Sequence, residues 1–199
     1  ITGTDVNCFG GSDGSVNLTA AGGTPGYSYE WSNGLGVILP ITSEDLSNVQ
    51  ASNYTASVTD SRGCTASIAQ TIAQPSVPLT STPVLTNIDC FGQSTGTIDP
   101  VVTGGTVPYN YNWSNGASTS VVTNLLAGVY SLTVIDARAC SATYTYEITQ
   151  PGGPLVVTLS GVDILCNGES TGSVSSQVTG GTPGYIYSWN NGASTSSIS

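Results

Sequence analysis

Large apolar side chains recur at alternate positions in short runs along the chain, and turn-forming residues close each run. The clearest run places Tyr27, Tyr29 and Trp31 two residues apart, and an Asn-Gly pair follows directly. Because side chains on a strand alternate between its two faces, this spacing puts the three rings on one face. Asn-Gly adopts the positive φ angles of a tight hairpin turn. The pattern therefore predicts a core strand that ends in a turn.

The same stretch occurs three times, each time after a Gly-Gly-Thr tripeptide. The two further copies contain Tyr109, Tyr111 and Trp113, and Tyr185, Tyr187 and Trp189. A Gln-Pro pair closes each complete unit shortly before residues 76 and 152. We therefore expect three domains: repeat 1 at residues 1–76, repeat 2 at 77–152, and the incomplete repeat 3 at 153–199. The first unit carries a longer loop between Gly36 and Asp45, which we interpret as an insertion on a fixed scaffold.

Each unit contains roughly six or seven strand patterns with turn signals between them, as in an antiparallel immunoglobulin-like β-sandwich. In repeat 2 we expect strands at residues 79–90, 97–103, 109–113, 120–125, 130–136 and 142–148. The Leu-x-Ala-Gly-x-Tyr run that ends at Tyr130 resembles the tyrosine corner of such sandwiches. A solenoid is the competing architecture, but its period is usually shorter. The sequence thus predicts an all-β array of tandem domains.

The five cysteines recur at equivalent positions of the repeats. Cys8, Cys90 and Cys166 open the three units, whereas Cys64 and Cys140 end a strand pattern in repeats 1 and 2. These positions predict one disulfide in each complete unit, Cys8–Cys64 and Cys90–Cys140, with the partner of Cys166 outside the chain. Each bridge would contribute roughly 4 kcal/mol in the loop-entropy model. Disulfides persist in oxidising compartments, so we expect an exported protein.

Composition narrows the classes of function. The 199 residues include 12 acidic, 2 basic and no histidine residues, for a net charge of −10. Phosphate binding and attraction to anionic membranes both require clustered Lys and Arg, so neither nucleic acid nor a membrane surface is an expected partner. No apolar run approaches the roughly 20 residues of a membrane span. The chain opens at Ile1 rather than Met, which suggests a segment of a longer protein.

Catalysis and metal binding have few candidate residues. No histidine is present for proton transfer, and Glu30 aligns with Asn112 and Ser188, so no acidic pair recurs across the units. We expect no enzyme activity. The cysteines lack the Cys-x-x-Cys spacing of a zinc site, and we expect no metal ligands. Calcium is the alternative cofactor, since Asp60 and Asp136 recur, but turn capping by these side chains is the preferred interpretation.

The aromatic stretches have two interpretations. Exposed rings would stack on sugars, whereas buried rings would form the core of a sandwich. One tryptophan per unit at a fixed distance from a cysteine favours the core. We therefore assign the following residues to the core: Tyr27, Tyr29, Trp31, Tyr54, Tyr109, Tyr111, Trp113, Tyr130, Tyr185, Tyr187 and Trp189.

These motifs together resemble a known family. The run Cys-x-Gly-x-Ser-x-Gly-Ser/Thr-Val/Ile at each opening cysteine, the Gly-Gly-Thr stretch through Asn-Gly, and the closing Gln-Pro are similar to the SprB-type repeat of cell-surface adhesins in gliding Bacteroidota. The resemblance covers the whole chain. It implies export through the type IX secretion system, contact with the secretion and gliding machinery, and display at the cell surface as a filament.

The expected function is accordingly a structural and adhesive repeat array within a gliding-motility filament. Its partners would be neighbouring repeats and an extracellular substratum or polysaccharide, bound by weak multivalent contacts. Two alternatives are a carbohydrate-binding module array of a secreted hydrolase and a self-assembling extracellular fibre.

Overall fold

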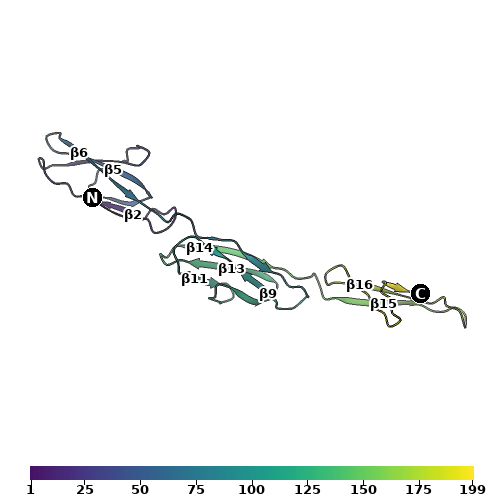
Figure 1. Cartoon of the computed structure of the whole chain (residues 1–199). Coiled ribbons are helices and arrows are strands. Elements are labelled where there is room, and N and C mark those ends of the chain that lie inside the picture. The colour runs from purple at the N-terminus through teal and green to yellow at the C-terminus, as the bar shows by residue number, and fades with distance from the viewer. The chain divides into compact units, whose positions relative to one another are not determined.

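The computed structural model describes all 199 residues, and every regular element in it is a β-strand (Figure 1). The strands form small antiparallel sheets, which confirms the predicted all-β class. The chain divides into two compact units: residues 1–81, 102–111 and 133–143 form one, and residues 82–101, 112–132 and 144–199 form the other. This division cuts across the sequence repeats, so the domain boundaries near residues 76 and 152 stay a prediction.

Repeat 1 is an immunoglobulin-like sandwich of two three-stranded sheets. One sheet has the order β1 (Thr2–Thr4), β2 (Gly14–Asn17), β4 (Leu46–Val49). The other has the order β3 (Ser28–Ser32), β5 (Ser52–Thr59), β6 (Thr65–Ile72). Alternation along the strands sends one side chain in two inward, and the buried core consists of Val6, Val16, Leu18, Trp31, Leu46, Val49, Tyr54, Ala56 and Ile72.

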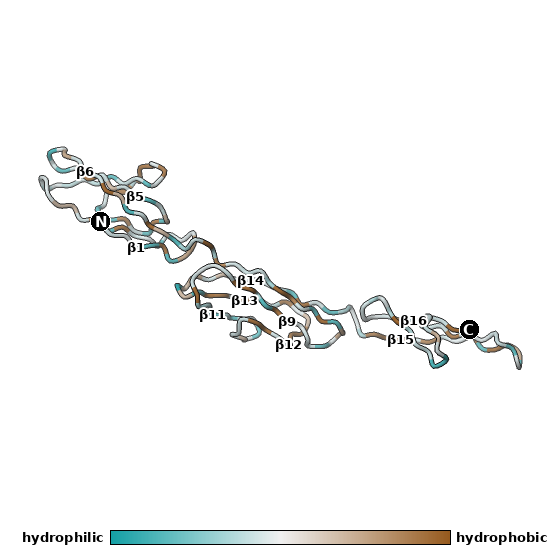
Figure 2. Tube along the Cα trace, in the orientation of Figure 1, coloured by the Kyte–Doolittle hydropathy of each residue, from teal (hydrophilic) through white to brown (hydrophobic).

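Repeat 2 reproduces the strand order of repeat 1. One sheet contains β8 (Val84–Thr86), β9 (Gly96–Asp99) and β12 (Val122–Leu125), with β9 in the middle. Another contains β11 (Asn110–Trp113), β13 (Gly128–Ile135) and β14 (Ser141–Ile148), with β13 in the middle. A two-stranded sheet joins β7 (Thr80–Ser81) to β10 (Val102–Thr103). Apolar residues concentrate along β9, β13 and β14 (Figure 2).

Two strands expected in repeat 2 are each divided in the structure. The expected strand at 79–90 becomes β7 and β8, and the one at 97–103 becomes β9 and β10. Pro83 follows the end of β7, and Pro100 follows the end of β9. Because proline has no N–H to donate to a sheet, it interrupts the pairing. Val101 also takes a φ of 39°, which is incompatible with a continuous strand.

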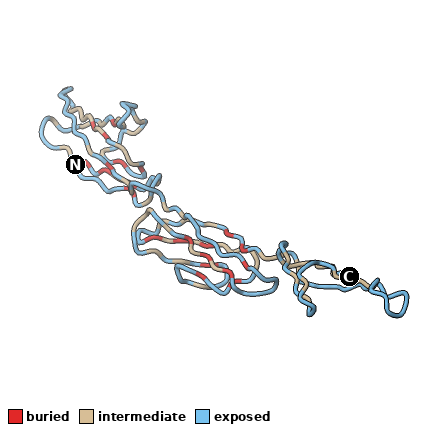
Figure 3. Tube along the Cα trace, turned by 45° about the vertical axis from the view of Figure 1, so that its right-hand side comes forward, coloured by how far each residue is buried: buried red, intermediate tan, exposed pale blue.

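Repeat 3 contains β15 (Val156–Val162), β16 (Ser173–Thr179) and β17 (Ser197–Ile198). No residue after Ile148 is buried (Figure 3). Every side chain of β15 is exposed, which leaves five large apolar residues of this repeat open on or near that strand: Leu155, Val156, Val157, Leu159 and Val162. The three strands do not bury a core of their own.

The tyrosine corner predicted at Tyr130 is confirmed, and the structure shows the same bond at Tyr54 in repeat 1. The Tyr130 hydroxyl donates to the Leu126 carbonyl oxygen at 3.0 Å, and the Tyr54 hydroxyl donates to the Gln50 carbonyl oxygen at 2.9 Å. Each bond spans four residues and ties the start of β13 or β5 to the preceding corner.

The predicted disulfide in each repeat is wrong. The structure bonds Cys8 to Cys140, with Cα atoms 5.6 Å apart, and leaves Cys64, Cys90 and Cys166 as exposed thiols. The predicted pairs Cys8–Cys64 and Cys90–Cys140 therefore do not form, and one bridge spans 132 residues instead.

The length of β6 explains why Cys8 and Cys64 cannot meet. Cys64 directly precedes the eight residues of this strand, whereas Cys8 lies near its other end, where the Val6 amide donates to the Ala73 carbonyl at 2.9 Å. Eight strand residues span roughly 26 Å, and a disulfide requires Cα atoms within about 7 Å. The eight residues of β14 separate Cys90 from Cys140 in the same way, because the Ile88 amide donates to the Thr149 carbonyl.

Candidate functional site

The best-organised polar group in the chain is the turn between β13 and β14. Asp136 is 2 % exposed, and its Oδ1 accepts the amides of Arg138 and Cys140, both at 2.8 Å. Its Oδ2 accepts the Thr106 amide at 2.8 Å. A Cβ at Gly105 would stand 2.7 Å from the same oxygen, so only glycine leaves room for this approach. One carboxylate thus positions Cys140 and fixes the Gly-Gly-Thr segment beside it.

Repeat 1 builds the same turn around Asp60. The Asp60 Oδ1 accepts the amides of Arg62 and Cys64 at 2.9 Å, and Oδ2 accepts the Thr24 amide at 3.0 Å. In both turns the amide of the aspartate donates to the carbonyl of the cysteine, at 3.0 Å for Asp60 and 2.9 Å for Asp136. Cys64 is therefore presented in the same way as Cys140.

The backbone amides lower the pKa of both carboxyl groups. For Asp60, the amide of Thr24 is the largest cause, followed by that of Cys64. For Asp136, burial raises the pKa, but the amides of Thr106, Cys140 and Arg138 and the Arg138 charge together outweigh it, and the pKa falls. Hydrogen bonds to the charged form favour that form, so both turns are held by carboxylates. The interpretation of these residues as turn caps agrees with this geometry.

The linker between repeats 1 and 2 lies against this turn. A Cβ at Gly104 would overlap the carbonyl oxygen of Pro78, and the φ of Gly104 is +78°, so glycine is required there on two grounds. Strand β7 continues the linker and pairs with β10, with Thr80 opposite Thr103. The Leu79 side chain contacts Gly105, with Cδ1 3.2 Å from the Cβ position of that glycine.

Repeat 3 receives its linker by the same contacts. A Cβ at Gly180 would overlap the Pro154 carbonyl oxygen, and the Gly181 amide donates to the Gly153 carbonyl at 3.0 Å. Val156 pairs with Thr179 in the register that Thr80 and Thr103 have in repeat 2. The Gly-Gly pair is thus a seat for the preceding linker, a role that the sequence alone did not suggest.

Cys8 is near the start of the sequence, but its loop lies beside the last residues of repeat 1, next to the linker. Asp5 Oδ1 accepts the Ala73 amide at 2.8 Å, and Gln74 Oε1 accepts the Gly10 amide at 2.8 Å, which holds the Cys8 loop against the closing Gln-Pro. The bridge to Cys140 then spans the linker. A polar cavity of about 290 Å³ lies beside the linker, lined in part by Asp5, Gln74, Ser76, Thr106 and Arg138. We call this arrangement of Gly-Gly seat, Asp turn, linker strand and disulfide the repeat joint.

The aromatic residues assigned to the core differ in their burial. Trp31 is 0 % exposed, and Tyr54 and Trp113 are each 5 % exposed. The other aromatic residues of the assignment are half-buried: Tyr27, Tyr29, Tyr109, Tyr111, Tyr130, Tyr185, Tyr187 and Trp189. Of the three rings in each Tyr-x-Tyr-x-Trp stretch, only the tryptophan is buried, and only in the two complete repeats.

The first tyrosine and the tryptophan of each stretch donate their polar hydrogen atoms to backbone carbonyls. The first tyrosine of each stretch donates its hydroxyl to the first glycine of Gly-Gly: Tyr27 to Gly22, Tyr109 to Gly104, and Tyr185 to Gly180. Trp113 Nε1 donates to the Thr119 carbonyl at 2.9 Å, and Trp31 Nε1 donates to Ser43 at 3.0 Å. The second bond spans 12 residues rather than 6, because the longer loop of repeat 1 lies inside it.

No group of three or more His, Cys, Asp or Glu residues in the chain could hold a metal ion. None of the elements is a long apolar helix of the kind that crosses a membrane. The chemistry that the structure brings together is a joint between neighbouring repeats, in which the contact of Gly-Gly with a linker recurs and the disulfide occurs once.

Comparison with known proteins supports the repeat assignment. The fold and the joint define the class of protein, a tandem array of immunoglobulin-like β-domains. The sequence matches the SprB repeat family at residues 1–36, 82–118 and 157–194, together more than half of its length, and the chain belongs to that family. Repeats of this family are extracellular, surface-type domains, and a disulfide fits an oxidising environment. They are typically structural rather than enzymatic.

Among solved structures, the amphioxus IgVJ-C2 molecule matches 68 % of this chain and 94 % of its own, at 15 % identity and a TM-score of 0.30. The N-terminal eight Ig domains of Down Syndrome Cell Adhesion Molecule isoform 1.30.30 match 94 % of this chain at 16 % identity and a TM-score of 0.32. This chain spans 30 % of that structure. No protein with a curated description matches the chain by sequence.

Proposed function

We propose that this chain is a spacer that transmits tension along the shaft of a bacterial cell-surface adhesin filament that serves gliding motility and attachment. The observation that carries the proposal is the Cys8–Cys140 bridge, which spans the linker between two repeats. A filament that grips a surface transmits tension along its chain, and an unprotected linker would be its weakest part. The bridge carries that tension past residues 9–139 by a covalent bond.

Several features of the chain fit a spacer better than a receptor. Trp31 and Trp113, the rings best suited to stack on sugars, are buried, and the hydroxyl of the first tyrosine of each stretch is bonded to backbone, as Tyr109 is to Gly104. The outward residues between them, Ser28 and Glu30 in β3, are Asn110 and Asn112 in β11. A surface that differs between copies is expected of a solvated face.

The finer parts of the proposal come from family membership. Export follows the type IX secretion route, and the partners are neighbouring repeats, the gliding machinery, and an extracellular substratum or polysaccharide. Adhesion then arises from many weak contacts along one filament, because multivalency multiplies affinity without a strong single site. The chain uses no cofactor and catalyses no reaction in this proposal.

Single-molecule pulling of the oxidised chain from its two termini tests the mechanical role. The bridge shields the residues that it encloses, so only the segments outside it extend under force. Reduction releases the segment between the two cysteines, and its sequence separation of 132 adds on the order of 470 Å of contour length at about 3.6 Å per residue. A Cys140→Ser variant is the control and extends fully without reductant. Equal extension before and after reduction contradicts the proposal.

A glycan array with the intact chain separates the spacer from the carbohydrate-binding alternative. The spacer binds no soluble sugar with sub-millimolar affinity. Saturable sugar binding that is lost on substitution of surface residues beside Trp113 would favour the alternative instead.

A further inference from the structure

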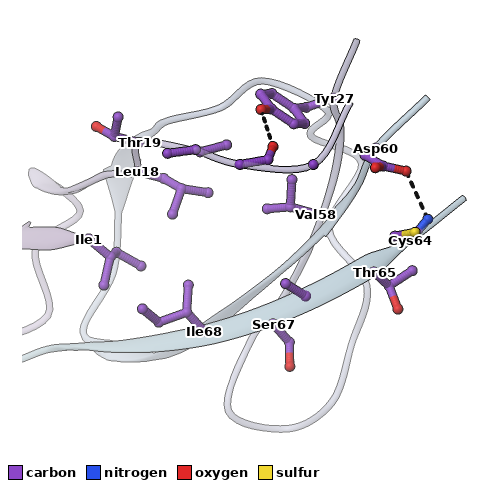
Figure 4. A pocket seen from close by; sticks show the side chains of 15 residues that line it. Ile1, Leu18, Thr19, Tyr27, Val58, Asp60, Cys64, Thr65, Ser67 and Ile68 are labelled. Carbon is purple, nitrogen blue, oxygen red and sulfur yellow. Dashed lines mark hydrogen bonds between the residues drawn. The ribbon is translucent and has the colours of Figure 1, made fainter. Parts of the chain in front are cut away.

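An open cavity of about 420 Å³ lies beside Cys64 in repeat 1 (Figure 4). Apolar side chains line much of it, among them Ile1, Leu18, Val58 and Ile68, and the backbone of the Gly22-Gly23 pair contributes to the same lining. Cys64, an exposed free thiol, also lines this cavity.

In the other two repeats a linker leucine lies at the corresponding place. In repeat 2, Leu79 of the linker contacts Gly105, the counterpart of Gly23. In repeat 3, Leu155 occupies the same position, with Cδ1 3.1 Å from the Cβ position of Gly181. Both leucines follow a proline and lead into a strand with the same register, as described for the repeat joint.

Repeat 1 has the Gly-Gly seat of this joint, but no linker strand lies on it. Residues 19–21, which correspond to the region of β10, pair with no strand. A Cβ at Gly22 would meet nothing within 4 Å, whereas the same atom at Gly104 or Gly180 would overlap a linker carbonyl. The Gly22 φ of +83° nevertheless matches the +78° of Gly104. The backbone of this glycine therefore has the same conformation with no linker on it as Gly104 has beneath one.

The thiol next to this seat, that of Cys64, has the same hydrogen-bonded surroundings as the bonded Cys140. Cys64 is the exposed counterpart of the bonded Cys140, and the same pattern of carboxylate and backbone bonds positions both. Gly63 has a φ of +83° and Ala139 one of +65°, so even the residue before each cysteine shares the left-handed backbone.

We propose that the cavity and Cys64 form a docking site for a second copy of this repeat. The proline-leucine linker strand of that copy fills the cavity and pairs with residues 19–21. Its opening cysteine, the counterpart of Cys8, bonds to Cys64. Cys90 is the complementary donor, because it holds in repeat 2 the place of Cys8 and bonds to the counterpart of Cys140 in a further copy. In an array of such copies, each disulfide thus joins two successive repeats.

Formation of the bridge is an ordinary thiol–disulfide exchange. Two cysteine thiols lose two protons and two electrons in total and form one S–S bond. A disulfide-form oxidoreductase accepts them and leaves as a dithiol; in the experiment, oxidised glutathione takes this part and leaves as two glutathione thiols.

The test adds a donor repeat to the intact chain. A copy of residues 77–158 fused before Ile1 places its linker leucine at the spacing from Gly23 that Leu155 has from Gly181. After oxidation with glutathione, non-reducing peptide mapping should find the Cys90 of the added copy bonded to Cys64. The Cys8–Cys140 bridge is the internal control for folding. A free Cys64 in a chain that contains the control bridge overturns the proposal, and so does a fused chain in which neither bridge forms.

A second measurement tests the strand without the disulfide. In the fused chain carrying Cys64→Ser, Gly22→Ala should lower the Tm of repeat 1 by about 4 °C more than it does in the unfused chain, because the added Cβ then overlaps the docked linker. Equal effects in the two chains would show that no linker enters the cavity.

Discussion

Cys8 and Cys140 share a disulfide although 132 residues separate them in sequence. One belongs to the opening loop of repeat 1 and the other to the turn before β14 in repeat 2. The bond therefore crosses the linker, and it encloses most of two sequence repeats in one covalent loop. In the loop-entropy model, a loop of this length contributes about 5 kcal/mol to stability.

Trypsin should reveal this pairing directly. The chain contains no lysine and only Arg62 and Arg138, so complete digestion gives residues 1–62, 63–138 and 139–199. Without reductant, the first and last fragments should remain joined, and the middle fragment should appear alone with two free thiols. Mass spectrometry after alkylation measures both.

The competing pairing gives a different digest. Bridges Cys8–Cys64 and Cys90–Cys140 would hold all three fragments in one species, and that result would contradict the structure. Cys140→Ser is the matched control, because it should release all three fragments.

Replacement of Trp113 by alanine should destabilise repeat 2 strongly. The side chain is 5 % exposed, its ring centroid lies 5.9 Å from that of Tyr146, and its Nε1 bond to Thr119 would be lost. Removal of a large buried ring costs about 3–5 kcal/mol. Urea unfolding, followed by tyrosine fluorescence, measures the change.

Trp189→Ala supplies the comparison within the same chain. It occupies the equivalent position in repeat 3, where it is half-buried and no residue is fully buried. Its replacement should change stability by about 1 kcal/mol or less. Equal costs for the two variants would mean that the Trp113 ring is not part of a packed core.

Much of the fold follows from the sequence, because its determinants are local. The Tyr-x-Tyr-x-Trp alternation places a buried Trp31 in β3, and the run before Tyr130 gives the tyrosine corner. The longer loop of repeat 1 also lies where the spacing indicates, between Trp31 and its acceptor Ser43.

The disulfide pairing could not be predicted in this way. Cysteines that recur once per unit have the same spacing whether they bond inside one repeat or between two. Only the extent of β6 and β14, which places the two cysteines of a repeat at opposite strand ends, separates these cases. The role of Gly-Gly as a linker seat was hidden for a similar reason, since its partner carbonyl at Pro78 lies 26 residues before Gly104.

Acid should destabilise the chain through its two Asp turns. The pKa values of Asp60 and Asp136 are lower in the folded chain than in the unfolded one. Their contribution is therefore fully present above the unfolded value of about 3.9, and it is lost as the pH falls through the lower folded values. Urea midpoints measured between pH 7 and pH 2.5 should fall over this window.

Asn substitutions identify the source of this acid sensitivity. An amide side chain keeps one acceptor oxygen but cannot accept on both sides of the turn, so Asp136→Asn should lower stability at pH 7 by about 2 kcal/mol. The Asp60→Asn, Asp136→Asn double variant should also show a flatter pH dependence below pH 4. A double variant with the same acid response as the parent chain would assign that response to other carboxylates.

Alanine at Gly104 should loosen the joint between repeats 1 and 2. The new Cβ would overlap the Pro78 carbonyl oxygen, and the φ of +78° adds backbone strain. Gly22→Ala is the matched control, because its φ of +83° gives similar strain while its Cβ would meet nothing within 4 Å. The difference between the two variants therefore isolates the contact with the linker.

We expect Gly104→Ala to cost about 2 kcal/mol more than Gly22→Ala, since the linker must shift or β7 must separate from β10. Hydrogen exchange adds a local measurement: the Gly105 amide, which donates to Val77, should lose protection in Gly104→Ala and keep it in Gly22→Ala. If the two variants have equal stability and equal protection, the linker does not rest on the Gly-Gly seat. The Cys8–Cys140 bridge would then hold the repeats together without a shaped interface, and Gly-Gly would serve only the turn into β11.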